Sequence, residues 1–185
     1  MKLLRTRRRD RFTLKLNLFP QETVPFDRIK ALTEEGFQYL DPDLIQLRDY
    51  QAAATAIILG GQNSGLNLDT ARGKTIVAFL VMDKVLAQGK VVFLAPQTAL
   101  CDQHFRRAKE RFAGLNGEEI GMVTGDVGPK NRLTVYEKSR VVVATPQTFL
   151  NDLKARRTSL EGVALVIFDE IQLASRSYAY IPIAR

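Results

Sequence analysis

Cysteine, histidine and long apolar runs are scarce in this chain of 185 residues, which contains one cysteine, Cys101, and one histidine, His104. A single cysteine excludes an internal disulfide and fits a reducing compartment, so Cys101 is interpreted as a small core residue. No apolar run reaches the roughly 18 residues of a membrane span, and we expect no membrane partner. Residues 12–16 alternate apolar and polar side chains, which does not fit the apolar block of a secretion signal.

Positive charge is concentrated at the start of the chain. The formal net charge is +7, and residues 1–12 hold six basic side chains against Asp10, a balance of 6 − 1 = +5. Such an arm attracts phosphate backbones and loses this attraction as the salt concentration rises. A frayed, solvated tail and a targeting segment are the alternative interpretations of the same residues.

Residues 67–75, which read NLDTARGKT, end as a phosphate-binding loop does. In such a loop backbone N–H groups surround a β-phosphate, Lys74 reaches the β and γ oxygens, and the Thr75 hydroxyl binds Mg²⁺. The apolar residues 76–81 predict a helix after the loop, and a helix N-terminus favours anions. The last three residues of this segment, 73–75, could alternatively be a glycine and a lysine at the start of an ordinary helix.

An apolar run, residues 163–168, ends in the adjacent acids Asp169 and Glu170. A run of this length predicts a strand buried on both faces. An NTPase needs two acids at such a strand end, one to hold Mg²⁺ and one to orient and deprotonate the attacking water. Two acids in a solvated loop are the alternative, but the upstream lysine loop favours an NTPase.

Strand and helix patterns alternate from residue 65 onward. The predicted strands are residues 65–68, 91–95, 120–123, 140–144 and 163–168, and the predicted helices are residues 74–87, 98–112, 129–137 and one with Pro146 at its first position. This alternation predicts an α/β fold with a parallel sheet and crossover helices. Residues 65–68 are the poorest strand, because polar Asn67 stands where a buried strand is apolar.

The first 44 residues are expected to be a basic arm followed by an accessory element that packs on the main domain. Residues 13–18 alternate as a short strand does, and residues 27–36 have the pattern of a capped helix that ends at a glycine. Residues 41–43, Asp-Pro-Asp, mark the most favourable boundary. The predicted domains are therefore residues 1–44, a basic arm with an accessory strand and helix, and residues 45–185.

Individual roles can be predicted for three residues. Gln51 lies in a helix expected to end near Leu59, and its amide can donate to and accept from the adenine edge, although a surface glutamine is also consistent. His104 lies on or beside an apolar helical stripe; without a second histidine or a cysteine pair it is interpreted as a packing or hydrogen-bonding residue. Thr145 is expected to cap the helix that begins at Pro146.

Taken in order, these segments resemble the first motor lobe of the superfamily 2 helicases, in particular the archaeal Hef and Fanconi-anaemia-M type of DNA-repair translocases. The matching segments are residues 48–51 (RDYQ), 70–75 (TARGKT), 95–100 (APQTAL), 103–104 (QH), 124–125 (TG), 144–148 (ATPQT), 168–170 (FDE) and 177–180 (SYAY). The resemblance covers about residues 40–185. It implies a RecA-like P-loop NTPase fold, which is a three-layer sandwich with a mostly parallel central sheet.

The resemblance also implies ATP and Mg²⁺ as cofactors and assigns the site residues. The implied nucleotide-binding residues are Gln51, Thr70, Ala71, Arg72, Gly73, Lys74 and Thr75. The implied catalytic residues are Lys74, Asp169, Glu170 and Gln172, and the implied metal ligands are Thr75 and Asp169. In this assignment Gln51 contacts adenine, while Glu170 activates the water.

A nucleic-acid strand, DNA with RNA as the alternative, is the implied partner. The implied contacts are Pro96, Gln97, Thr98, Thr124, Gly125, Thr145, Pro146 and Gln147. Each of these segments follows a predicted strand on the same sheet edge as the ATP site, and each offers hydroxyl or N–H groups that bond phosphate without reading sequence. Ordinary helix capping is the alternative role for Thr98 and Thr145.

Three residues depart from the family pattern: Ala71 replaces a usual glycine, Arg72 a neutral residue, and Gln172 the histidine or aspartate that links the γ-phosphate to the second lobe. If position 71 requires positive φ, alanine costs roughly 1–2 kcal/mol, which is about a five- to thirty-fold loss of nucleotide affinity. The chain ends 185 − 169 = 16 residues after Asp169, so it is expected to lack the second lobe. Without that lobe's arginine fingers, worth roughly 10³ to 10⁵ in rate, it is expected to be a feeble ATPase.

The sequence thus supports one hypothesis and two rivals. The hypothesis is the N-terminal ATP-binding lobe of a superfamily 2 DNA helicase or translocase, cytoplasmic and nucleoid-associated, or nuclear in a eukaryote. It would act with a second RecA-like lobe, in a parent chain or in trans. The first rival is a degenerate, non-hydrolysing nucleic-acid-binding or partner-docking module. The second is a small-molecule kinase, which the absence of a long insertion for a substrate lid disfavours.

Overall fold

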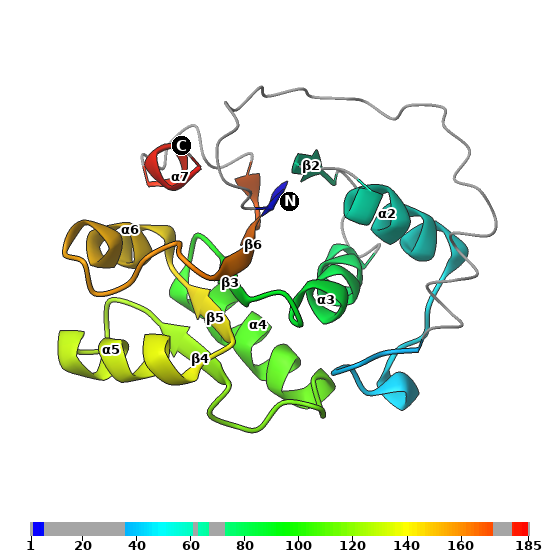
Figure 1. The fold of residues 1–185 in the computed structure, drawn as a ribbon, viewed down its shortest axis with the longest axis horizontal. Coiled ribbons are helices and arrows are strands. Elements are labelled where there is room, and N and C mark those ends of the chain that lie inside the picture. Colours follow the sequence, from blue (N-terminus) through cyan, green and yellow to red (C-terminus); the bar gives the residue numbers. More distant parts are fainter. Residues whose placement is uncertain (1, 6–35, 61–62, 67–72, 172–178, 185) are drawn as a thin grey trace.

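One mixed sheet with helices on both faces forms the centre of the computed structural model, which describes residues 2–5, 36–60, 63–66, 73–171 and 179–184 (Figure 1). The strands are β1 (Lys2–Arg5), β2 (Asn63–Gly65), β3 (Lys90–Leu94), β4 (Ile120–Val123), β5 (Val141–Ala144) and β6 (Val163–Phe168). The helices are the 3₁₀ turn η1 (Pro42–Leu44), α2 (Asp49–Gly60), α3 (Lys74–Val85), α4 (Thr98–Arg111), α5 (Pro129–Lys138), α6 (Pro146–Lys154) and α7 (Tyr180–Ile183). None of the helices in these ranges has the length and apolar character that a membrane span requires.

The strands lie in the order β2-β1-β6-β3-β5-β4. β3 pairs in parallel with β5 and β6, and β4 pairs in parallel with β5. β1 is antiparallel to both β2 and β6, so β2 runs in the same direction as β6. The predicted α/β sandwich with a mostly parallel sheet is therefore confirmed.

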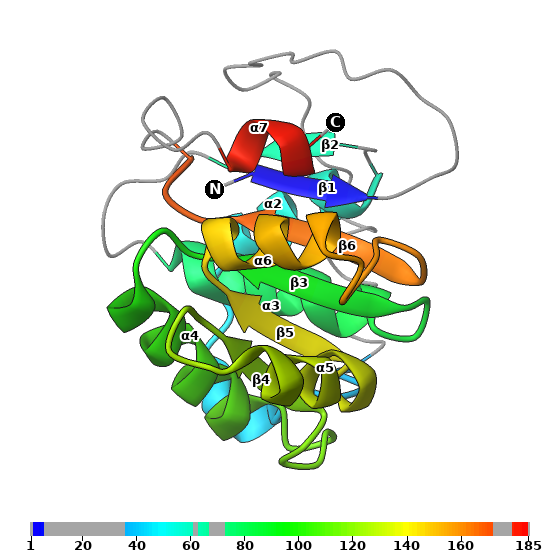
Figure 2. The ribbon, with the colours of Figure 1, turned by 90° about the vertical axis from the view of Figure 1, so that its left-hand side faces the viewer.

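Alternate residues of the central strands enter two separate cores. One core receives Val91, Phe93, Val141, Val143, Leu165 and Ile167, and the other receives Val92, Leu94, Val142, Ala144, Val166 and Phe168. Helices α2, α3 and α4 cover the first face, whereas α5, α6 and α7 cover the second and lie in front of the strands in Figure 2. Burial on both faces is why these strands read as continuous apolar runs.

Two expectations about the sheet need correction. The strand expected at residues 65–68 is Asn63–Gly65, and residues 67–68 lie outside the described part of the chain. Lys2–Arg5, expected to belong to the basic N-terminal arm, instead form β1 between β2 and β6. The reason is that backbone pairing with two neighbours satisfies N–H and C=O groups whatever the charge of the side chains. The strand expected at residues 13–18 and the helix expected at residues 27–36, apart from its final Gly36, lie outside the described residues.

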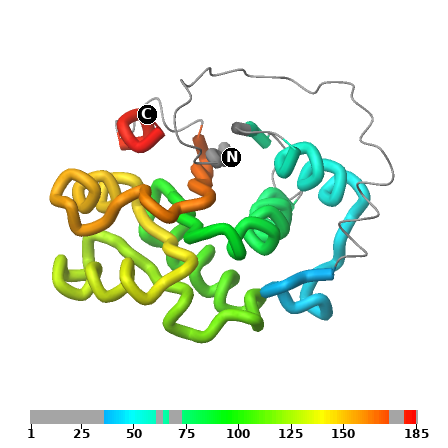
Figure 3. Tube along the Cα trace, viewed as in Figure 1, coloured from blue at the N-terminus to red at the C-terminus, as the bar shows by residue number. Residues whose placement is uncertain are grey.

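A buried carboxylate on α3 holds the segment that precedes α2. Asp83 is fully buried, and its Oδ1 accepts backbone N–H groups from Gln38 (3.1 Å), Tyr39 (2.7 Å) and Leu40 (2.9 Å). The same segment also contacts the end of α4, because the Asp41 N–H donates to the Arg111 carbonyl at 2.7 Å. Figure 3 shows this part of the chain passing along the ends of α3 and α4.

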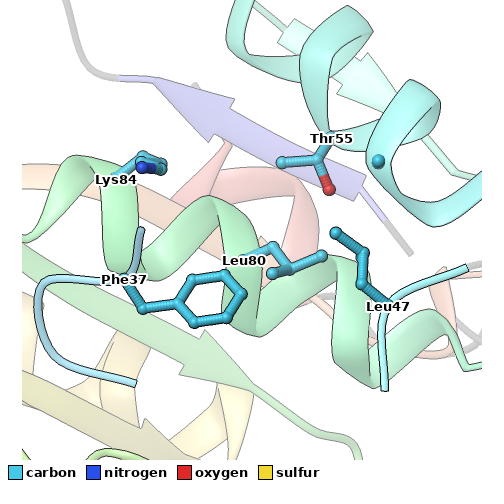
Figure 4. A pocket seen from close by; sticks show the side chains of 6 residues that line it. Phe37, Leu47, Thr55, Leu80 and Lys84 are labelled. Atoms are coloured by element: carbon cyan, nitrogen blue, oxygen red, sulfur yellow. The ribbon is translucent and has the colours of Figure 1, made fainter. Parts of the chain in front are cut away.

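A small apolar cavity lies between this segment, α2 and α3 (Figure 4). Its lining residues are Phe37, Leu47, Ala52, Thr55, Leu80 and Lys84. Its volume of about 10 Å³ matches the space that one water molecule needs, so it cannot hold a nucleotide.

We predict that Asp83→Ala lowers the free energy of unfolding by about 2–5 kcal/mol, because three backbone N–H groups at a buried site lose their acceptor. Urea denaturation followed by circular dichroism measures this change. The control is Asp102→Ala, which removes a partly exposed carboxylate paired with Arg106 and should change stability by less than about 1 kcal/mol. Equal effects of the two substitutions would contradict the proposed role of Asp83.

Candidate functional site

The carboxyl ends of four parallel strands meet in a continuous row. Three N–H···O bonds just beyond the strands join neighbouring ends: Asp169 to Leu94 (2.8 Å), Ala95 to Ala144 (3.1 Å) and Thr145 to Val123 (3.2 Å). The acidic segment and the three predicted nucleic-acid segments therefore lie side by side, following β6, β3, β5 and β4 in turn. A crevice outside the carboxyl ends of the strands is where open α/β sheets bind ligands.

Lys74 and Thr75 open α3 at this same edge. The opposite end of α3 leads into β3, whose first residue, Lys90, donates its N–H to the Gly162 carbonyl at the amino edge of the sheet. A helix of 12 residues is roughly 18 Å long, so the first turn of α3 lies toward the carboxyl edge, where Asp169 is. The topology thus brings the lysine loop and the acids to one edge.

Gln51 lies directly against Gly73. Gly73 precedes α3 in the left-handed conformation, with φ of 78°, and a Cβ placed on it would lie 2.3 Å from Nε2 of Gln51. The Gln51 side chain is buried, and its Oε1 accepts the N–H of Arg48 at 3.1 Å. The predicted adenine reader therefore borders the predicted phosphate loop, although its amide is directed to protein groups.

Asp169 is held at three points. Its N–H donates to Leu94, its carbonyl accepts the Tyr180 hydroxyl at 2.9 Å, and its Oδ2 lies 2.9 Å from Nε2 of His104. Burial by itself raises the pKa of Asp169, but the hydrogen bond and charge of His104, together with the N–H of Glu170, outweigh burial and lower that pKa below its usual value. The carboxylate is consequently ionised at neutral pH, as a metal ligand must be.

Glu170 has an unusual backbone conformation. Its φ of 48° is in the left-handed region, which an L-residue adopts at a cost of about 1–2 kcal/mol. Such strain is found preferentially at functional sites. Tyr180 stabilises this turn through the Asp169 carbonyl, and burial together with the Asp169 charge raises the pKa of Tyr180, so its hydroxyl stays a donor.

The predicted nucleic-acid segments differ in exposure. The exposed members are Gln97, Thr98, Gly125 and Gln147. Thr124 is buried and its hydroxyl faces Asp126 at 3.5 Å, so at this position only backbone groups and Gly125 can meet a phosphate. Pro146 is also buried, at the first position of α6 as expected.

The capping prediction for Thr145 is half correct. Thr145 occupies the N-cap position of α6, but its hydroxyl donates to the Thr148 hydroxyl at 2.8 Å and makes no capping bond. Thr98 is the first residue of α4, after the N-cap Gln97. Neither threonine hydroxyl therefore satisfies the helix terminus, which leaves N–H groups at both helix starts for another acceptor.

Four predicted site residues lie outside the described part of the chain. They are Thr70, Ala71, Arg72 and Gln172. Their roles remain predictions.

The described residues fit a magnesium nucleotide. Thr75 offers a hydroxyl and Asp169 an ionised carboxylate, and hard oxygen ligands of this kind suit Mg²⁺ together with phosphate oxygens and water. Because its N-cap residue is Gly73, the N-terminus of α3 has no capping side chain, which suits a phosphate. Among the described residues no cluster of three acids, histidines or cysteines forms a metal site of protein ligands alone.

The sequence did not identify the partners of Asp169. The prediction that His104 is a packing residue is confirmed by its contact with Phe93, but the prediction of a local hydrogen bond is wrong, because its partner Asp169 lies 65 residues away. The prediction that Cys101 is a core residue is also confirmed: it is fully buried, and burial raises the pKa of its thiol to about 11. The segments containing His104 and Tyr180 belong to the helicase resemblance, which was the only available signal for these contacts.

We predict that Gly73→Ala destabilises the fold by about 1–3 kcal/mol, because alanine strains a left-handed backbone and its Cβ meets the Gln51 amide. Thermal or urea unfolding measures the change. The double variant Gly73→Ala/Gln51→Ala should be destabilised by less than the sum of the two single changes. Gly117→Ala, where a Cβ meets open space, is the control. Simple additivity would contradict the contact.

Comparison with known proteins identifies the family. Residues 48–182 match the family described as DEAD/DEAH box helicase. The crystal structure of the Hef helicase domain from Pyrococcus furiosus is 40% identical, with a TM-score of 0.72, and covers 80% of this chain and 31% of that chain. The ATP-dependent DNA helicase mph1 of Aspergillus niger is 32% identical over 170 residues, which is 90% of this chain and 15% of that protein.

A plant helicase is also similar in sequence to this chain. The DEAD-box ATP-dependent RNA helicase FANCM of Arabidopsis thaliana is 31% identical over 144 residues, which is 76% of this chain and 11% of that protein. The chain thus spans less than one third of the length of each of these proteins. The family match covers most of the chain and includes both the lysine loop and the acidic strand end. With its RecA-like sheet, this chain belongs to the DEAD/DEAH box helicase family and is a helicase lobe homologous to these proteins.

Proposed function

We propose that this lobe binds Mg·ATP at the carboxyl edge of its sheet and holds a DNA strand along the neighbouring strand ends. The observation that carries the proposal is the row of strand ends, in which the acidic segment after β6 adjoins the segments after β3, β5 and β4. A nucleotide at α3 and a nucleic-acid backbone at α4 and α6 would then lie on one continuous edge. This arrangement suits a motor protein that couples ATP hydrolysis to movement along a nucleic-acid strand.

Each residue has one task in this proposal. Lys74 neutralises the β and γ phosphates, while the Thr75 hydroxyl and the Asp169 carboxylate hold Mg²⁺. Glu170 orients the attacking water and accepts its proton. Gln51 borders the loop at Gly73 and contacts the adenine once a nucleotide is present.

The nucleic-acid strand is held by its phosphates. Exposed Gln97 and Thr98 at the start of α4, Gly125 after β4, and Gln147 in the first turn of α6 provide amide, hydroxyl and backbone donors. Such groups bind phosphate oxygens without reading bases. We propose DNA as the substrate because the mph1 relative is named a DNA helicase, with RNA as the alternative that the FANCM relative's name supports.

Strong activity requires more protein than this chain. The matched region is less than one third of the length of these relatives, so we propose that a second RecA-like lobe completes the ATP site. That lobe would supply the arginines that stabilise charge on the transferred phosphoryl group, worth roughly 10³ to 10⁵ in rate. Binding is therefore a better measurement than turnover for this chain alone.

The first prediction from this proposal concerns nucleotide binding. Wild type should bind ATP in the presence of Mg²⁺, and Lys74→Ala should weaken binding about ten- to hundred-fold, because a charged hydrogen-bond donor contributes about 1.5–3 kcal/mol. Glu170→Gln should bind as wild type does. Isothermal titration calorimetry measures all three, and Lys109→Ala, an exposed lysine on α4, is the control. No heat from wild type at millimolar ATP and Mg²⁺ would overturn the ATP site.

The second prediction concerns DNA. Gln97→Glu and Gln147→Glu should each weaken binding of a fluorescent single-stranded oligonucleotide about fivefold, because a carboxylate near a phosphate costs on the order of 1 kcal/mol in water. The affinity of wild type should fall as salt rises. Gln88→Glu is the matched control, an exposed glutamine at the opposite edge of the sheet. Equal losses for the three variants in fluorescence anisotropy would refute the proposed interface.

A further inference from the structure

His104 is buried beside the acidic segment and is the only histidine of the chain. It lies in α4, where Cys101, His104 and Ala108 face the sheet at three- and four-residue steps. Its ring packs on the Phe93 ring with a centroid distance of 4.4 Å and an interplanar angle of 37°. Packing therefore restricts the ring, so its nitrogens have defined directions.

One ring nitrogen reaches the proposed magnesium ligand. Nε2 lies 2.9 Å from Oδ2 of Asp169, and both side chains are largely shielded from water. Among the described residues Nδ1 of His104 has no hydrogen-bond partner and is buried. A histidine used only for stability would more usually satisfy both nitrogens, because an unpaired buried polar atom costs about 1–3 kcal/mol.

The contact fixes how Asp169 presents its carboxylate. The backbone of Asp169 is already held by Leu94 and Tyr180, so rotation of the side chain is its main remaining freedom. The hydrogen bond from His104 to Oδ2, together with the N–H of Glu170, restricts this rotation. Carboxylates that bind metals are generally oriented in this way by a second hydrogen bond, and removal of that partner lowers metal affinity or activity roughly 10- to 100-fold.

We propose that His104 is a positioning residue for the magnesium site: its Nε2–H holds Oδ2 of Asp169 so that the second carboxylate oxygen meets the ion. This inference rests on the proposed function, because it requires Asp169 to bind Mg²⁺. The same contact joins the metal ligand to α4, the helix whose first turn carries Gln97 and Thr98. His104 itself touches neither nucleotide nor metal.

The first experiment compares His104→Phe with His104→Gln. Phenylalanine keeps a flat ring against Phe93 but has no donor, whereas glutamine places an amide N–H at about the reach of Nε2. We expect ADP affinity without metal to change less than about threefold in either variant. The enhancement of ADP affinity by Mg²⁺ should fall roughly 10- to 100-fold in His104→Phe and recover in His104→Gln. Calorimetry with and without Mg²⁺ measures both quantities.

The outcomes separate this inference from the proposed function. If Mg²⁺ enhances ADP binding equally in wild type and His104→Phe, the positioning role is wrong and the site stands. If Mg²⁺ has no effect in wild type, the site itself is wrong and the inference with it. Equal losses in His104→Phe and His104→Gln would indicate a packing role only and would also overturn the inference.

A second measurement uses the wild-type chain and needs no substitution. Because the chain has a single histidine, its imidazole signals in a nuclear magnetic resonance spectrum belong to His104 without ambiguity. Mn²⁺, added with ADP as a paramagnetic substitute for Mg²⁺, should broaden these signals at substoichiometric concentration. Signals that stay sharp while Mn²⁺ and ADP bind would place the metal away from Asp169 and end the proposal, even if His104→Phe fails to fold.

Discussion

The short turn at Asp169 depends on contacts from three different elements. Its N–H bonds to the end of β3, its carbonyl accepts a hydroxyl from α7, and its carboxylate meets α4 through His104. These contacts offset the strain of the left-handed Glu170 that follows. An acid held at the backbone and at the side chain needs little rearrangement before it binds an ion, which is the basis of a preorganised site.

The sheet determines which segments can share such a site. Because β3, β4, β5 and β6 are parallel and each leaves the sheet at the same edge, residues more than 70 positions apart become neighbours there. Apolar residues on both faces of these strands fix their register, since a shift by one residue would exchange the two cores. The chemistry at the edge is therefore positioned by side chains that take no part in it.

Local patterns in the sequence were enough for most of this architecture. The continuous apolar runs predicted β3 to β6, and a proline at the first helical position predicted the start of α6 at Pro146. The row of segments after these strands followed from parallel topology alone. Two of the features that escaped prediction, β1 between β2 and β6 and the contact of His104 with Asp169, are pairings between distant segments. Pairings of this kind produce no periodic pattern of apolar and polar residues in the segments that form them.

The half of the site that we propose to bind phosphate is supported by different contacts. Gly73 is packed against Gln51 of α2, while the far end of α3 is tied through Asp83 to residues 38–40. Because the Leu40 bond is buried and the other two are partly buried, movement of α3 along its axis would expose or break them at a cost of several kcal/mol. α3 is therefore a fixed support for Lys74 and Thr75.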